Sequence, residues 1–437
     1  MLVGAIGFTW FSISTHFFGK KRLFLTKTNL ADEIQEAGAV FQLPKEIQIE
    51  NPNLPAGKKT VALEYTFDPE LQTQAEELFK DFRPDYGAIV VMDATTGRIL
   101  AMTSYSDHPK SVHALGNLAL RATFPSASVF KVVTAAAAIA EKNYSPNTII
   151  PFDGLNHTLY RKNISQTRYN KYTRYMTLRD AFAHSVNTVF GKIGAMTVGA
   201  TGLRDYANRF GFNRKIASDL PIQQGQALIP EDMLGLAEAA SGFTKDNRMS
   251  PMQGAMIAAA VAHDGLMMEP YAIQSAKTQD GTLIYQGESK PGAQVIDAHT
   301  AEEIREMMRE TVHSGTSRKA FRSFFKGDFV GLDVGGKTGS LSGDDPPGKY
   351  DWFVGYASGG TNKIAISALS IHGKYWKVKS AYLARKIVER YFHSRASRNN
   401  MAMKGPSFHL FHEANAAPAH VHHRKHRTRP HSPSTHR

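Results

Sequence analysis

Short apolar stretches near both ends of the chain have the pattern of β-strands, and they flank a middle part with helical periodicity. Apolar runs bounded by turn residues are typical of strands, whereas apolar positions that recur every three to four residues are typical of helices. These patterns predict strands over residues 61–67, 86–93, 98–105, 333–341, 351–356 and 364–371. They predict helices over residues 69–82, 125–140, 178–184, 188–196, 201–210, 251–263, 300–312 and 378–392.

This order of elements favours an α+β fold. Strands and helices that occupy separate parts of a chain form an antiparallel sheet with helices packed against it, whereas strict alternation gives a parallel sheet. Two N-terminal strands, 86–93 and 98–105, would join three C-terminal strands. We therefore expect an antiparallel sheet of about five strands covered by helices, with a helical subdomain formed by the middle of the chain.

Changes in composition divide the chain into four parts. Residues 65–393 carry the regular patterns and form the expected folded domain. Residues 23–64 are mixed and contain three prolines, which suggests a lead-in or linker. Residues 394–437 are rich in His, Arg, Pro and Ser and poor in large apolar groups, so we expect a disordered tail. Residues 1–22 are the expected N-terminal membrane anchor or signal-like segment.

The first eighteen residues carry no formally charged side chain, and the basic run Lys20-Lys21-Arg22 follows them. Such a stretch is barely long enough to cross a bilayer, so an anchor, a cleaved signal and a buried segment are all compatible with it. Basic residues after an anchor usually mark the cytoplasmic side, which conflicts with the extracytoplasmic location that the chemistry below implies. The apolar stretch alone therefore does not establish a membrane anchor, and the anchor hypothesis also relies on the location implied by the chemistry.

Charge and cysteine content narrow the chemistry. The chain has 437 residues and a net charge of +13, of which +7 falls in the tail from Ser394 onward. The basic character thus says little about the folded part, and we expect no nucleic acid partner. The absence of cysteine excludes disulfides, zinc–thiolate sites and cysteine nucleophiles. No metal site and no cofactor is predicted.

A serine and a lysine stand at the start of an alanine-rich helix. Ser128 and Lys131 are three residues apart, so their side chains would share one face, and Pro125 and Ser126 would begin and cap the helix. A serine hydroxyl is a weak nucleophile until a base takes its proton, and a neutral lysine amine could be that base. Because this spacing also arises by chance, as at Ser323 and Lys326, the pair needs support from elsewhere.

Two further motifs follow in order and supply that support. Ser185-x-Asn187 lies at a boundary between two predicted helices, 57 residues after Ser128. Lys337-Thr338-Gly339 lies 209 residues after Ser128, on a predicted strand with glycines on both sides. Glycine in a strand allows another backbone to approach closely, which suits a strand at the edge of a site.

With these three motifs, the chain resembles the penicillin-binding protein transpeptidases, of the serine D,D-peptidase and serine β-lactamase superfamily. The likeness covers about residues 65–392, and several supporting stretches lie outside the three motifs. They are Thr66-Phe67-Asp68-Pro69-Glu70-Leu71-Gln72, Met249-Ser250-Pro251-Met252-Gln253, Gly315-Thr316 and Asp351-Trp352-Phe353-Val354-Gly355-Tyr356.

The resemblance implies a role for each motif residue. Ser128 would be acylated by a D-Ala-D-Ala stem peptide or a β-lactam, with Lys131 as the base. Ser185 would relay a proton to the leaving amine, and Asn187 would bind the substrate amide or Lys131. Lys337, Thr338 and Gly339 would bind substrate, the first two through its terminal carboxylate. Backbone N–H groups of Ser128 and Ser340 would form the oxyanion hole.

The family holds several activities that these motifs do not separate. The leading hypothesis is a peptidoglycan D,D-transpeptidase, and a D,D-carboxypeptidase, an endopeptidase or a β-lactamase are alternatives. Ser340 stands where many transpeptidases have threonine, and no Glu-x-x-Leu-Asn stretch follows Asn187. A non-catalytic β-lactam sensor or cell-wall scaffold is an alternative of another class. The implied partners are peptidoglycan stem peptides, β-lactams, the membrane and other cell-wall synthesis proteins, and the implied location is the periplasmic side of the cytoplasmic membrane.

Overall fold

The computed structural model describes residues 25–38, 41–50, 57–108 and 115–403. The expected anchor, residues 1–22, lies outside these ranges. Within them, none of the helices combines the length and the apolar character needed to span a bilayer. The chain divides into one unit that ends at Arg395 and a second that starts at Ala396, and the description below concerns the first unit.

A five-stranded antiparallel sheet forms the centre of the fold, as the sequence predicted. Its strand order is β13-β14-β15-β3-β4, so the two N-terminal strands lie beside the three C-terminal ones. The strands are β3 (Tyr86–Asp93), β4 (Ile99–Ser106), β13 (Asp333–Asp344), β14 (Pro347–Gly359) and β15 (Asn362–His372). The link between the two groups is the β3–β15 pairing, in which Ile364 lies opposite Asp93.

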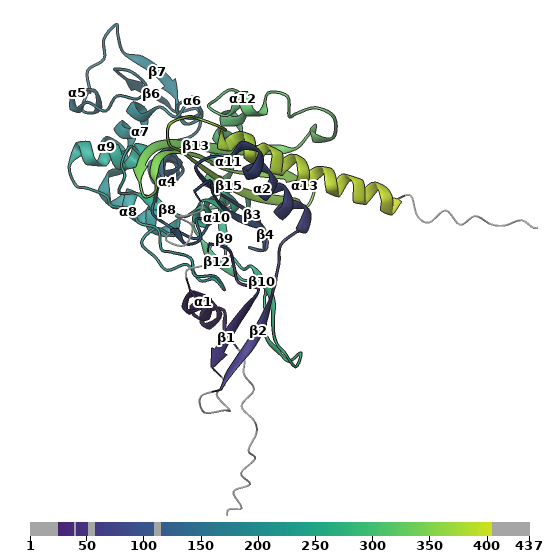
Figure 1. Cartoon of the computed structure of the whole chain (residues 1–437). Coiled ribbons are helices and arrows are strands. Elements are labelled where there is room, and N and C mark those ends of the chain that lie inside the picture. Colours follow the sequence, from purple (N-terminus) through teal and green to yellow (C-terminus); the bar gives the residue numbers. More distant parts are fainter. Residues whose placement is uncertain (1–24, 39–40, 51–56, 109–114, 404–437) are drawn as a thin grey trace, which may run out of the picture. The chain divides into compact units, whose positions relative to one another are not determined.

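Helices cover both faces of this sheet, which explains why its strands are apolar on both sides. Along β3, Val90 belongs to one core and Val91 to the other. The first face packs on α10 (Pro251–Ala262), whose residues are all buried. The second face packs on α2 (Pro69–Phe82) and on α13 (Ser380–Met403), and Figure 1 shows these two helices close together beside the sheet.

The middle of the chain forms the expected helical subdomain, with changes in detail. The helices are α4 (Lys131–Lys142), α5 (Arg161–Ile164), α6 (Leu178–Ala183), α7 (Asn187–Ile193), α8 (Gly199–Arg209) and α9 (Met233–Ser241). A π-helical turn, Gly194–Val198, interrupts the helix predicted over 188–196. Residues 150–175, for which the sequence predicted neither strand nor helix, contain most of a small hairpin of β6 (Ile149–Phe152) and β7 (Arg174–Thr177).

The expected lead-in, residues 23–64, carries regular structure of its own. It contains α1 (Lys27–Glu36), β1 (Glu46–Glu50) and the start of β2 (Lys58–Tyr65). The two strands join β10 (Ile273–Thr278) and β11 (Leu283–Gln286) in a second sheet of order β1-β2-β10-β11. The lead-in therefore contributes half of a sheet instead of serving only as a linker.

The long helix α11 and several short elements complete the described part of the chain. They are β5 (Phe124–Pro125), β8 (Arg248–Met249), β9 (Leu266–Met268), β12 (Pro291–Gln294), α11 (Ala298–His313), α12 (Arg318–Phe321) and the 3₁₀ turns Ala127–Phe130 and Gly327–Phe329. The helix predicted over 378–392 is longer than expected, since α13 continues to Met403 into the part expected to be a disordered tail. Residues 404–437 lie outside the described residues.

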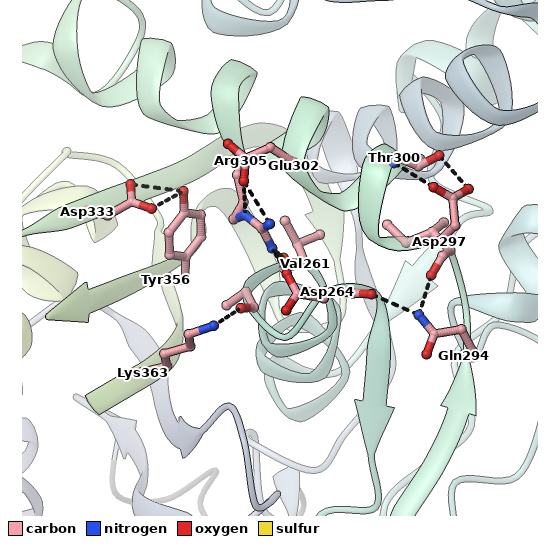
Figure 2. A network of polar contacts seen from close by, with 12 residues as sticks. Val261, Asp264, Gln294, Asp297, Thr300, Glu302, Arg305, Asp333, Tyr356 and Lys363 are labelled. Carbon is pink, nitrogen blue, oxygen red and sulfur yellow. Dashed lines mark hydrogen bonds and ion pairs between the residues drawn. The ribbon is translucent and has the colours of Figure 1, made fainter. Parts of the chain in front are cut away.

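A polar network fastens α11 to the neighbouring helix and sheet, as Figure 2 shows. Arg305 donates to the carbonyl oxygen of Val261 at 2.7 Å, and its guanidinium pairs with Asp264 at 2.9 Å. Beside it, the Tyr356 hydroxyl donates to Asp333 at 3.2 Å, which joins β14 to the start of β13. Since charge-assisted hydrogen bonds are the stronger ones, the Arg305 contacts hold α11 firmly against the C-terminal end of α10, beside the paired strands β13 and β14.

Candidate active site

The predicted nucleophile lies in a 3₁₀ turn, Ala127–Phe130, and Lys131 is the first residue of α4. The expected cap at Ser126 is wrong, because this residue has helical backbone angles and its side chain caps nothing. Its buried Oγ has no hydrogen-bond partner among the described residues. Ala127 has a left-handed backbone with φ of 48°, which is unfavourable for alanine and marks a locally strained turn.

Lys131 is fully buried and contacts three oxygen atoms. Its Nζ lies 2.8 Å from Ser128 Oγ, 2.8 Å from Asn187 Oδ1 and 2.6 Å from the carbonyl oxygen of Ser241. Burial, and then the nearby charge of Lys337, lower the pKa of Lys131 well below its ordinary value. A neutral amine has two N–H donors and one lone pair. The donors can serve Asn187 and Ser241, which leaves the lone pair for the hydroxyl proton of Ser128.

A second lysine and serine face the first pair. Lys337, on β13, is also fully buried, and its Nζ lies 2.9 Å from Ser185 Oγ. Burial lowers the pKa of Lys337 to about 7. Ser185 has a left-handed backbone with φ of 57°, between the end of α6 and the start of α7. This kink directs its hydroxyl to β13 while Asn187, two residues later, reaches Lys131.

Strand β13 lies directly against the nucleophile turn, and Gly339 makes this possible. A Cβ atom on Gly339 would lie 3.2 Å from Val129 and 3.3 Å from Ala127, closer than ordinary contacts. The indole Nε1 of Trp352, on the neighbouring strand, donates to the carbonyl oxygen of Pro125 at 2.9 Å. Gly339 is therefore a point at which β13 and the nucleophile turn approach closely, as the sequence predicted. The Trp352 hydrogen bond also fixes the start of this turn to β14.

A pocket of about 830 Å³ opens above these groups. Its walls contain six of the eight predicted site residues, namely Ser128, Ser185, Asn187, Thr338, Gly339 and Ser340. Lys131 and Lys337 lie buried beneath them. The structure thus brings all eight predicted residues together. In the part of the chain that it describes, no cluster of His, Asp and Glu side chains could hold a metal ion.

Sequence reasoning missed three residues that contribute to the site. The carbonyl oxygen of Ser241 binds Lys131, but a backbone carbonyl leaves no signal in the residue type, and helix α9 was not predicted. Thr316 Oγ1 lies 2.6 Å from Thr338 Oγ1, although the stretch Gly315-Thr316 had been noted. His157 lines the pocket, and burial together with the charge of Lys131 lowers its pKa.

Comparison with known proteins agrees with this arrangement. The family model for the penicillin binding protein transpeptidase domain matches residues 87–389. The peptidoglycan D,D-transpeptidase PbpA of Mycobacterium tuberculosis is 28% identical over 345 residues, which covers 70% of this chain and 67% of that protein. Stage V sporulation protein D of Bacillus subtilis is 27% identical over 301 residues, covering 65% of this chain and 44% of that protein.

Solved structures show the same fold. Penicillin-binding protein A from M. tuberculosis, as an imipenem acyl-enzyme complex, is 25% identical with a TM-score of 0.60, covering 75% of this chain and 79% of that one. The D,D-transpeptidase domain of an Eggerthella lenta peptidoglycan glycosyltransferase is 23% identical with a TM-score of 0.61, covering 80% and 90%. With its family match spanning residues 87–389, which include all eight predicted site residues, this chain belongs to the penicillin-binding protein transpeptidase domain family.

Proposed function

We propose that this protein is a peptidoglycan D,D-transpeptidase that works through an acyl-enzyme on Ser128. The observation that carries the proposal is the 2.8 Å contact between Lys131 Nζ and Ser128 Oγ, made by a fully buried lysine whose pKa is lowered well below its ordinary value. A relative of this chain is named peptidoglycan D,D-transpeptidase, and a solved relative forms an acyl-enzyme with imipenem. Both findings support the same chemistry here.

Acylation uses two serine–lysine pairs, first Ser128 with Lys131 and then Ser185 with Lys337. Ser128 Oγ attacks the carbonyl carbon of the penultimate D-Ala while Lys131 takes the hydroxyl proton. The backbone N–H groups of Ser128 and Ser340 stabilise the oxyanion of the tetrahedral intermediate. Ser185, hydrogen-bonded to Lys337, delivers its proton to the departing amine and regains the proton that Lys131 had taken, so that the C–N bond breaks, D-Ala leaves and Lys131 is neutral again. Lys337 and Thr338 hold the substrate carboxylate.

Transfer completes the cycle. An amine from a second stem peptide attacks the acyl carbon and its proton passes to Lys131. The bond from the carbon to Ser128 Oγ then breaks, and Ser128 Oγ takes this proton, which restores the hydroxyl and the neutral amine. A β-lactam undergoes the same first step, but its leaving nitrogen stays attached to the acyl group. The second step is then blocked, which accounts for a stable adduct.

The decisive test follows the fate of a donor peptide. We expect a synthetic peptide ending in D-Ala-D-Ala to release D-Ala and, with an amine acceptor present, to yield a new amide product detectable by mass spectrometry. Hydrolysis alone would instead indicate a D,D-carboxypeptidase or endopeptidase. Rapid release of a penicillin adduct would indicate a β-lactamase. A stable adduct with no D-Ala release would indicate a sensor or scaffold.

We further propose that residues 1–22 tether the protein to the cytoplasmic membrane and that the catalytic domain faces the cell wall, where other cell-wall synthesis proteins are its partners. The apolar first eighteen residues motivate the tether, and the peptidoglycan substrate requires the extracytoplasmic side. A C-terminal reporter that is active only in the cytoplasm should therefore be silent. Strong reporter activity would refute this location.

A further inference from the structure

A basic and aromatic lobe stands beside the catalytic pocket. We define it as residues 154–175, which run from just after β6 into the start of β7, and Figure 1 shows this part standing out beside α6 and α7. It contains no Asp or Glu but five Lys or Arg residues: Arg161, Lys162, Arg168, Lys171 and Arg174. It also exposes four tyrosines: Tyr160, Tyr169, Tyr172 and Tyr175. Four exposed tyrosines together with an exclusively positive charge are unusual for a loop that only contacts solvent.

The lobe has a defined framework. Arg174 donates to Asn156 Oδ1 at 3.1 Å, and its guanidinium lies over the Phe152 ring at 4.4 Å. Gly154 packs so closely on Asn163 that an added Cβ would lie 2.2 Å from the amide nitrogen. Arg174 therefore has a structural role. The other four cations form no ion pair with any residue that the structure describes, so their charge is available to a ligand.

A groove of about 620 Å³ crosses the lobe. Tyr160 and Tyr172 line it and are 61% and 74% exposed, and Lys162 and Gln166 lie in the same wall. The groove also contains Asp153, whose buried Oδ1 has no hydrogen-bond partner among the described residues. Aromatic rings pack on the apolar face of a sugar ring, while an unpartnered carboxylate oxygen, an amide and an amine match its hydroxyl groups.

The groove and the catalytic pocket share one segment of chain. His157 lines the pocket, whereas Leu155 and Thr158, on either side of it, line the groove. The segment is fixed to the catalytic helix α7, since Asn187 donates its backbone N–H to the carbonyl oxygen of Asn156 at 2.7 Å. The buried Thr188 hydroxyl also lies 2.8 Å from the carbonyl oxygen of Thr158. A polymer bound in the groove would therefore lie next to the reacting peptide.

We propose that this lobe binds the glycan strand of peptidoglycan, with Tyr160 and Tyr172 stacking on sugar rings. Lys162, Arg161, Arg168 and Lys171 would attract the carboxylates of the attached stem peptides. This inference rests on the proposed function, because it assigns the polymer part of the same substrate to a second site. The lobe thereby selects stem peptides that are already part of a strand.

The test measures binding of the full-length protein to insoluble peptidoglycan by co-sedimentation, after penicillin has blocked the catalytic pocket. We expect the double variant Tyr160→Ala/Tyr172→Ala to bind about tenfold more weakly than wild type, because two aromatic contacts are lost. Lys162→Ala should weaken binding about threefold and reduce its salt dependence. Glycan strands freed of peptides by an amidase should still compete with peptidoglycan, since the tyrosines contact sugar.

Matched controls separate this inference from the proposed function. Tyr375→Ala removes a tyrosine that is 66% exposed elsewhere in the chain and should leave binding unchanged. The tail is present in every variant, so differences between variants report on the lobe. Unchanged binding by the double variant, with normal penicillin acylation, would overturn the lobe inference alone. An equal loss of binding to single-stranded RNA or anionic vesicles in the double variant would also overturn it, because the lobe would then recognise charge and not sugar. Failure of wild type to acylate would instead remove the proposed function.

Discussion

Replacing Ser128 with alanine is expected to abolish covalent labelling by a β-lactam while the protein keeps its fold. The substitution removes the hydroxyl that Lys131 contacts at 2.8 Å, and with it the oxygen that would be acylated. Loss of a catalytic nucleophile typically costs a factor of about 10⁴ or more in rate. Intact-mass spectrometry after incubation with penicillin measures the adduct, and the melting temperature reports the fold.

Ser126→Ala provides a matched control for this experiment. Ser126 lies two residues earlier in the same turn, but its buried Oγ has no hydrogen-bond partner among the described residues. This variant should therefore label like wild type. If Ser128→Ala labelled at the wild-type rate, and the adduct mapped to Ser323 or another residue, the assignment of the nucleophile would be refuted.

Lys131→Arg is expected to lower the acylation rate nearly as much, by a factor of about 10³ or more. A guanidinium stays protonated at every working pH, so it cannot accept the Ser128 proton even though it keeps a basic side chain. Lys131→Met, which removes the amine without adding a charge to the buried site, should be equally slow. Stopped-flow acylation by a chromogenic β-lactam gives these rates. Near-normal acylation by either variant would exclude Lys131 as the base.

The pH dependence of acylation tests the same residue in another way. Because burial and Lys337 lower the pKa of Lys131, the amine is neutral over a wider pH range, and the maximal rate should fall only as acid protonates it. Lys337→Met removes one of these two causes. The pKa of Lys131 should then rise, and the acidic limb of the rate profile should move to higher pH. A shift to lower pH would contradict the coupling between the two lysines.

The central sheet and several helix starts were predictable because local signals and tertiary packing agree there. Residues 86–93 and 364–371 are apolar at nearly every position, as strands buried on both faces require. Asp68 and Ser250 each precede a proline, and both accept hydrogen bonds from backbone N–H groups in the first turn, as capping residues do. The three motifs could be assigned to one site because each lies at the start of a predicted helix or on a predicted strand of this fold.

Other features carry no local signal. The Ser241 carbonyl is a functional group that every residue type possesses, so only the folded path of the chain selects it. Ser126 looks like a cap in sequence, but the chain forms a 3₁₀ turn there that packs closely against β13, a tertiary contact without a local signal. No strand was predicted around the lobe because the strands that flank it, β6 and β7, are only four residues long, which is too short for a periodic pattern to be recognised.

The strand order of the central sheet also determines when the protein can become reactive during synthesis. Every predicted site residue, up to Ser340, is made before β15, yet β13 and β14 reach β3 only through that strand. Until β15 emerges from the ribosome, the nascent chain holds all the catalytic side chains but cannot complete the central sheet that positions them. Pairings between such distant segments form slowly. Reactivity is therefore acquired last, after nearly the whole domain has been translated.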